Sequence, residues 1–225
     1  MKYDFFEKKL SKSRLDRYKN AFNGDTEKAL CLYKLNIELS KQFYGMLNFF
    51  EIMLRNAINE HYGNYFLNNN WISFKLNTDF FVERNKKSVI KEENKLRKAN
   101  CYSADKLVAS LSLGFWVSLF SKHSYAKGNK TLLQIFPNKQ KGMNQKDIYN
   151  ELDFIRTFRN RIAHYESICF NKNGDVSIDY AERSLYLTLK YVDFMDISMK
   201  AFLLSTNSLA EVILQIKDLM WKRIE

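Results

Sequence analysis

The sequence predicts an all-α fold, and three observations support this prediction. Seven Gly and one Pro in 225 residues is far below ordinary usage. A β-sandwich or barrel needs many tight turns, and such turns are built from those residues. Apolar residues recur at helical spacing along most of the chain. Hydrophobic residues make up 46% of the sequence, which is enough for a core and excludes a disordered or low-complexity chain. The length fits a single helical domain over residues 1–225.

The first part of the chain, residues 3–67, is expected to be helical throughout. Apolar residues at near-helical spacing predict a helix from Tyr3 to Phe22, and Asn23-Gly24 is a stop signal for it. Asp25 is suited to cap a second, longer helix, because its carboxylate accepts bonds from the unpaired first-turn N–H groups. One apolar stripe carries this helix nearly to Leu67.

The middle of the chain alternates between charged and apolar segments. We expect a loop through Trp71, followed by a basic helix over residues 80–99. Ser103 then caps the most apolar helix, a core helix over residues 104–121, in which Gly114-Phe115-Trp116 predicts close core packing. Residues 122–146 hold the only Pro, two Gly and six Lys without an acidic residue, which indicates a basic loop with one short helix near residues 131–136.

The last third of the chain returns to regular helices. A motif helix is predicted over residues 145–166, and Asn173-Gly174 between two apolar triplets predicts one small β-hairpin. Two closing helices over residues 179–222 complete the predicted bundle.

Two of the three histidines stand in near-copies of one pattern. Each copy contains an arginine, an asparagine and a histidine: Arg55, Asn56 and His61 in the first, Arg159, Asn160 and His164 in the second. These residue types suit RNA cleavage without a metal. Histidine transfers protons near neutral pH, and arginine donates to phosphate oxygens while the 2′-hydroxyl attacks.

Helix geometry places Asn160 and His164 in one row, which Arg156 extends, whereas Arg159 reaches the histidine from the side. One such helix supplies half of an active site. The other half would come from the Arg55–His61 helix or from the same helix of a partner, so we expect a homodimer as one arrangement. The alternative is that either pair only makes surface or interhelix hydrogen bonds, and His123 is expected to be simply exposed.

The segment Arg159-Asn160-Arg161-Ile162-Ala163-His164 resembles the R-N-x-x-x-H signature of HEPN ribonuclease domains. Together with Leu54-Arg55-Asn56-Ala57-Ile58, the block from Leu107 to Phe120 and Phe136-Pro137, it follows the order seen in bacterial Abi-like (AbiD/AbiF-type) abortive-infection proteins. The resemblance spans roughly residues 50–168.

This resemblance implies an all-α, HEPN-like helical bundle, a role in antiphage defence and metal-independent RNA cleavage. It implies that Arg159 and His164 are catalytic with Asn160 in support, and some similar proteins associate with a small structured noncoding RNA. The chain departs from the family after the motif, where Tyr165-Glu166-Ser167 stands in place of the usual His-Glu-Pro. The first motif is also not the usual catalytic one, which leaves a structural role open for His61.

A net charge of +11 predicts a polyanionic partner, of which RNA is the simplest. The excess is concentrated in residues 1–19, 82–98 and 122–146, which favours a binding surface over general solubility. The RNA-binding candidates are Lys86, Lys87, Lys91, Arg97, Lys122, Lys127, Lys130, Lys139, Lys141, Arg156 and Arg161. Trp71 and Tyr125 are weaker candidates for stacking on unpaired bases.

The sequence leads us to expect that this protein is outside several other classes of protein. The N-terminus lacks the apolar run of a signal peptide, and no stretch reaches the roughly 20 apolar residues of a membrane span. Three widely spaced cysteines without CxxC argue against disulfides and thiolate zinc sites, and no phosphate-cradling Gly-rich loop is present. We therefore expect a cytoplasmic protein with no metal and no small-molecule cofactor.

Two further functions stay open beside a ribonuclease. One is a non-catalytic RNA-binding module that holds a small noncoding RNA, in which the motif helices serve folding or dimer contact. The other is a helical protein that binds an anionic membrane surface.

Overall fold

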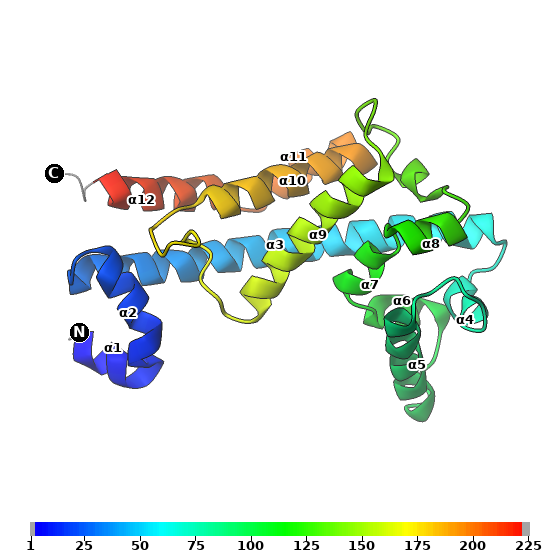
Figure 1. Cartoon of the computed structure of the whole chain (residues 1–225), viewed down its shortest axis with the longest axis horizontal. Coiled ribbons are helices and arrows are strands. Elements are labelled where there is room, and N and C mark those ends of the chain that lie inside the picture. The colour runs from blue at the N-terminus through cyan, green and yellow to red at the C-terminus, as the bar shows by residue number, and fades with distance from the viewer. Residues whose placement is uncertain (1–2, 222–225) are drawn as a thin grey trace. The chain divides into compact units, whose positions relative to one another are not determined.

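The computed structural model describes residues 3–221 and confirms the all-α prediction (Figure 1). The described residues contain twelve α-helices and one 3-10 helix, and they contain no strand. The helices are α1 (Tyr3–Leu10), α2 (Lys12–Ala21), α3 (Thr26–Tyr65), α4 (Trp71–Lys75), α5 (Glu83–Lys98), α6 (Ala104–Ser110), α7 (Leu113–Ser118), α8 (Lys122–Lys127), η1 (Leu132–Ile135), α9 (Gln145–Ala163), α10 (Asp179–Met195), α11 (Ile197–Ser205) and α12 (Leu209–Trp221).

The chain divides into two compact units. Unit 1 comprises Met1–Leu47, Phe158–Tyr186 and Phe202–Glu225, and unit 2 comprises Asn48–Thr157 and Leu187–Ala201. Helices α3, α9, α10 and α11 contribute residues to both units. The two sequence motifs therefore fall in different units, His61 in unit 2 and His164 in unit 1.

The long helix α3 begins as the sequence predicts. The Asp25 carboxylate accepts hydrogen bonds from the backbone N–H groups of Glu27 and Lys28, both at 3.0 Å. These bonds satisfy two of the first-turn donors that have no partner within a helix. Gly45 does not interrupt the helix, which continues to Tyr65.

Three predicted helices are each divided in two. The 3–22 segment breaks at Ser11, whose φ of +74° is incompatible with a helix. Ser103 caps its helix as predicted, accepting from the N–H of Lys106 at 3.1 Å. However, the predicted core helix over 104–121 ends early, because Leu111 and Ser112 adopt extended conformations. The first closing helix stops before Asp196, whose carboxylate accepts from the N–H of Ser198 at 2.8 Å and so starts a new helix.

The expected loop through Trp71 is wrong, because Trp71 opens helix α4 and is fully buried. Its indole N–H donates to the Asn59 side chain at 2.9 Å. The ring lies 5.0 Å from Tyr62 and 5.9 Å from Phe80, centroid to centroid. Trp71 is therefore a core residue of unit 2, and its suggested role in stacking on bases is withdrawn.

Two smaller predictions also need correction. The basic segment 122–146 was predicted to be a loop with one short helix, but it contains helix α8 in addition to the short helix η1. The predicted β-hairpin reduces to one antiparallel bridge between Phe170 and Val176. Gly174 takes a φ of +94° between them, the turn conformation for which glycine is suited.

The core of unit 1 is built around aromatic side chains. Tyr18 of α2 packs edge-on against Tyr33 of α3 and against Phe170, both at 5.1 Å. Phe43 and Phe158 pack at 4.8 Å. These contacts fix α2 and the segment after α9 to the first half of α3.

No single helix within residues 3–221 is both long and apolar enough to cross a membrane. Helices α11 and α12 satisfy the length and composition criteria only as a pair, across a bend.

Candidate functional site

The motif helix α9 ends at Ala163, three residues earlier than predicted, and the way it ends exposes His164. The N–H of Tyr165 donates to the carbonyl of Ile162 at 3.0 Å, and the N–H of Glu166 donates to that of Arg161 at 2.9 Å. This pair of bonds is the Schellman motif, which turns the chain away from the helix axis. His164 is thus the cap residue directly after the helix, with its side chain exposed.

A buried asparagine holds the chain that follows His164. Asn36 of α3 is only 7% exposed. Its side-chain oxygen accepts from the N–H of Ile168 at 3.0 Å and from the hydroxyl of Ser167 at 3.3 Å. Because a buried amide is costly to leave unpaired, these bonds fix the position of the segment beyond the motif.

His164 lines a cleft of about 410 Å³ in unit 1. We call it the His164 cleft. Three arginines, one histidine, one tyrosine and one glutamate account for its main side chains: Arg14, Arg17, Arg161, His164, Tyr165 and Glu166. Three guanidinium groups against one carboxylate give the cleft a positive balance, which suits an anionic ligand.

The three guanidinium groups are held in place by backbone carbonyls. Arg14 donates to the carbonyl of Tyr165 at 3.2 Å, and Arg17 donates to that of Asn171 at 3.1 Å. Arg161 donates to the carbonyl of Ser167 at 2.9 Å and pairs with Glu166 at 3.1 Å. A guanidinium has five N–H donors, so each arginine retains donors beyond these bonds. The cations are therefore oriented before a ligand arrives.

The N-terminal end of α2 also lies at the His164 cleft. Ser11 and Ser13 line it, and the Ser11 side chain makes no capping bond to the helix. The first N–H groups of a helix have no partner within it, and they carry the positive end of its dipole. They add to the attraction of the arginines for an anion.

Two residues of the His164 cleft have left-handed backbone conformations that disfavour a side chain. Ser11 has a φ of +74° and Tyr165 a φ of +57°. For a bulky residue such as Tyr165 this conformation is a genuine outlier, and strain of this kind is concentrated at functional sites. The Tyr165 side chain is also 80% exposed, so packing against other side chains does not explain why a tyrosine stands at this strained position.

Of the three predicted catalytic residues, only His164 lines the His164 cleft. Arg159 and Asn160 are both half-buried, and neither lines the His164 cleft. The backbone carbonyl of Asn160 accepts from the N–H of His164 at 2.9 Å, an ordinary helical bond. The arginine that the cleft places with His164 is Arg161, which the sequence suggested only for RNA binding.

The first motif has the environment of a packing site. His61 is half-buried, its Nε2 lies 2.9 Å from the Thr131 hydroxyl oxygen, and its ring stacks on Tyr65 at 6.3 Å. Burial lowers the pKa of His61 below its ordinary value, because a charged imidazole is poorly solvated there. Arg55 is half-buried with its Nε out of contact with solvent, and Asn56 is exposed.

The predicted RNA-binding side chains fall into two groups. Several engage acidic partners: Arg97 pairs with Glu93, Lys127 with Asp79, Lys87 with Glu83 and Arg156 with Asp153. Arg97 also lies over the Tyr102 ring at 4.1 Å, so it serves the packing of unit 2. Lys91, Lys122, Lys130 and Lys141 are exposed, and Lys86 and Lys139 are half-exposed. His123 is exposed, as expected, with its Nε2 3.0 Å from the carbonyl oxygen of Asp79.

Sequence reasoning missed three side chains of the cleft. Arg14 and Arg17 share one face of α2 at i and i+3, and their place in the basic N-terminal segment could have suggested them. Tyr165 gave no such signal, because a tyrosine is not expected at the left-handed position after a helix.

No group of three or more His, Cys, Asp or Glu side chains arranged to hold a metal ion occurs in the described part of the chain. No protein-family model matches this chain, and neither a curated protein nor a solved structure matches it significantly.

Proposed function

We propose that this protein binds RNA at the His164 cleft and cleaves it there by metal-independent chemistry. The observation that supports the proposal is the convergence of an exposed histidine with three arginines in one cleft. Charge-assisted bonds from guanidinium groups are among the strongest and most directional contacts to phosphate. A histidine beside a bound phosphodiester is a natural acid or base for its cleavage.

In the proposed reaction the ribose 2′-oxygen attacks the adjacent phosphorus. His164 takes the 2′-hydroxyl proton as the new P–O bond forms, and the bond to the 5′-oxygen breaks. Arg14, Arg17 and Arg161 stabilise the charge that builds on the non-bridging oxygens. The leaving 5′-oxygen then needs a proton. Because the cleft holds a single imidazole, water or a second copy of the chain supplies that proton, which is consistent with a homodimer.

Tyr165 has a place in this scheme as a surface for an unpaired base. Single-stranded RNA is commonly bound by stacking bases on exposed aromatic rings beside a basic groove. The Tyr165 ring is exposed at the edge of the cleft and is kept there in a strained backbone conformation. Stacking on a base would explain why this position carries a ring.

The biological role is part of the proposal and follows from the resemblance to Abi-like, HEPN-type proteins. It is an antiphage role in which cleavage of RNA in the cytoplasm halts the infected cell. Neither a metal nor a small-molecule cofactor enters this chemistry.

The experiment is an RNA cleavage assay in EDTA. Products should carry 2′,3′-cyclic phosphate ends, and the variant His164→Ala should form them far more slowly. Arg14→Gln should weaken RNA binding, while Lys12→Ala removes an exposed charge of the same helix outside the cleft and should have a smaller effect. Cleavage that needs Mg²⁺, or that continues near the wild-type rate in His164→Ala, contradicts the mechanism.

One observation favours a second candidate, a non-catalytic module that holds a small noncoding RNA. Arg159 and Asn160, the residues expected to support His164, lie outside the cleft. Extraction of nucleic acid from the purified protein separates the two candidates. A defined RNA recovered intact favours the binding module, and an empty protein that degrades added RNA favours the ribonuclease.

A further inference from the structure

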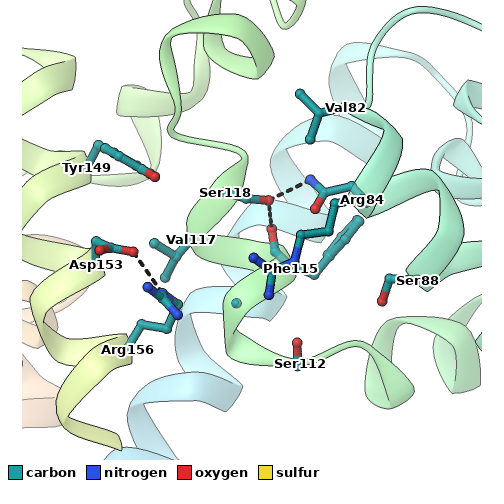
Figure 2. A pocket seen from close by; sticks show the side chains of 12 residues that line it. Val82, Arg84, Ser88, Ser112, Phe115, Val117, Ser118, Tyr149, Asp153 and Arg156 are labelled. Atoms are coloured by element: carbon teal, nitrogen blue, oxygen red, sulfur yellow. Dashed lines mark hydrogen bonds and ion pairs between the residues drawn. The ribbon is translucent and has the colours of Figure 1, made fainter. Parts of the chain in front are cut away.

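A second polar pocket, of about 240 Å³, lies in unit 2 between α5, α7 and α9 (Figure 2). Its lining includes Arg84 and Ser88 of α5, Ser112 at the start of α7, and Tyr149 and Arg156 of α9. All of these residues belong to unit 2. We call this the Arg84–Arg156 pocket.

The two arginines extend into the pocket from different helices, as Figure 2 shows. Arg156 donates from Nε to the Asp153 carboxylate at 2.7 Å and from Nη2 to the Thr157 hydroxyl at 3.5 Å, and these two bonds orient its guanidinium while its other donors stay available to a ligand. Arg84 forms no ion pair with any residue between 3 and 221. Two guanidinium groups against one carboxylate leave a net positive site.

Hydroxyl groups complete the set of donors. Ser118 is already engaged, since it accepts from the Asn85 side chain at 2.6 Å and donates to the carbonyl of Phe115 at 2.5 Å. The hydroxyls of Ser88, Ser112 and Tyr149 make no hydrogen bond within the described residues. These groups can donate to an anion that the arginines attract.

Gly114 helps to keep the pocket open. A Cβ atom added there would lie 3.6 Å from the Cδ of Arg156 and 3.6 Å from the Oγ of Ser112, both of which belong to pocket residues. A side chain at this position would therefore point into the pocket. A methyl group would fit at ordinary contact distance, whereas a longer side chain would occupy space that a ligand needs.

We propose that the Arg84–Arg156 pocket binds a phosphate monoester, either the terminal phosphate of an RNA strand or that of a free nucleotide. Paired guanidinium groups and several hydroxyl donors match a dianionic phosphate with its three free oxygens. The volume is below the roughly 300–1,000 Å³ of pockets that enclose a whole drug-sized ligand. It suits one phosphate group with part of its sugar. This site is separate from the His164 cleft and does not depend on the ribonuclease proposal.

The test measures binding to the full-length protein with three probes. Calorimetry with inorganic phosphate and with adenosine 5′-monophosphate tests a free ligand. Fluorescence anisotropy with one short RNA, carrying either a 5′-phosphate or a 5′-hydroxyl, tests a strand end in the His164→Ala background. The variants are Arg84→Ala, which removes an exposed side chain, and Gly114→Leu, which fills the pocket without changing charge. Lys91→Ala removes a charge from the same helix outside the pocket.

Arg84→Ala should weaken phosphate-dependent binding by about tenfold or more, because a hydrogen bond to a charged group is lost. Lys91→Ala should retain that binding. Arg84-dependent binding of adenosine monophosphate or phosphate identifies a free ligand. A preference for the 5′-phosphorylated RNA that Arg84→Ala abolishes identifies a strand end. If a folded Arg84→Ala protein, verified by circular dichroism, binds all probes as the wild type does, or if no probe binds, the proposal is overturned.

Discussion

The two Arg-Asn-His motifs have nearly the same sequence but different environments. His164 is exposed directly after the last residue of α9, beside three arginines in the His164 cleft. His61 lies within α3, four residues before its end. It is half-buried, hydrogen-bonded to Thr131 and stacked on Tyr65. The first environment is accessible to a ligand, and the second already satisfies its imidazole with protein contacts.

The difference depends on where each helix ends. The chain turns away directly after His164, because the Schellman bonds to Arg161 and Ile162 close the helix there. Helix α3 continues past His61 for another turn, so neighbouring side chains cover the ring. A short motif is therefore a weak guide to chemistry until the end of its helix is known.

The largest expected effect distinguishes the two histidines by activity. His164→Ala should lower RNA cleavage by about 10²–10⁴-fold, the usual contribution of a general acid or base. His61→Gln, which keeps a polar group near Thr131, should leave cleavage close to the wild-type rate. Rates on a labelled single-stranded RNA in EDTA measure both. Equal losses in the two variants would mean that the motifs act together and that the contrast between them is wrong.

The next effect concerns stability and contrasts the aromatic residue near each motif. Trp71 is fully buried and bonded to Asn59, two residues before His61. Trp71→Ala should therefore lower the free energy of unfolding by about 3–5 kcal/mol. Urea denaturation measures this loss. Tyr165→Ala, at the exposed ring beside His164, is the matched comparison and should change stability little.

The sequence predicted the all-α class, the cap at Asp25 and most helix positions, because these depend on local periodicity and capping. It did not predict the breaks at Ser11 and Leu111-Ser112. Ser11 breaks a helix because its φ is positive, and Leu111 and Ser112 break another because their backbone is extended. Serine and leucine have no special preference for either conformation, so the sequence carried no signal of these breaks. Nor could it place Trp71, since burial there depends on rings from other segments.

The candidate site was predictable only in part, because it too combines residues that are far apart in the sequence. The exposed histidine at the end of the motif helix was suggested by local sequence. Its partner Arg14 lies 151 residues away from Tyr165, whose carbonyl it contacts. A contact at that separation has no local signature. The Schellman turn with tyrosine in place of glycine also ran against the usual rule, and the Tyr165 ring was therefore missed.

A smaller effect comes from the strained backbone beside His164. Tyr165→Gly should raise the free energy of unfolding by about 1 kcal/mol relative to Tyr165→Ala, because glycine adopts a positive φ without the penalty of a Cβ. Both variants lack the ring, and both should bind RNA more weakly than the wild type if a base stacks on it. Thermal denaturation and RNA anisotropy on the two proteins separate the roles of backbone and ring. Unchanged RNA affinity in both variants would remove Tyr165 from the binding surface.

The smallest effect is a pH dependence that belongs to His61. Burial lowers the pKa of His61 in the folded protein, while the unfolded chain titrates near about 6.5. Below that pH the unfolded state binds more protons, so the free energy of unfolding falls as pH decreases from 7 toward the folded-state pKa. His61→Gln removes this contribution, and its stability should fall less over the same interval. Urea denaturation at several pH values between 7.5 and 5 measures the difference. Parallel curves for the wild type and His61→Gln would show that the ring is as well solvated when folded as when unfolded.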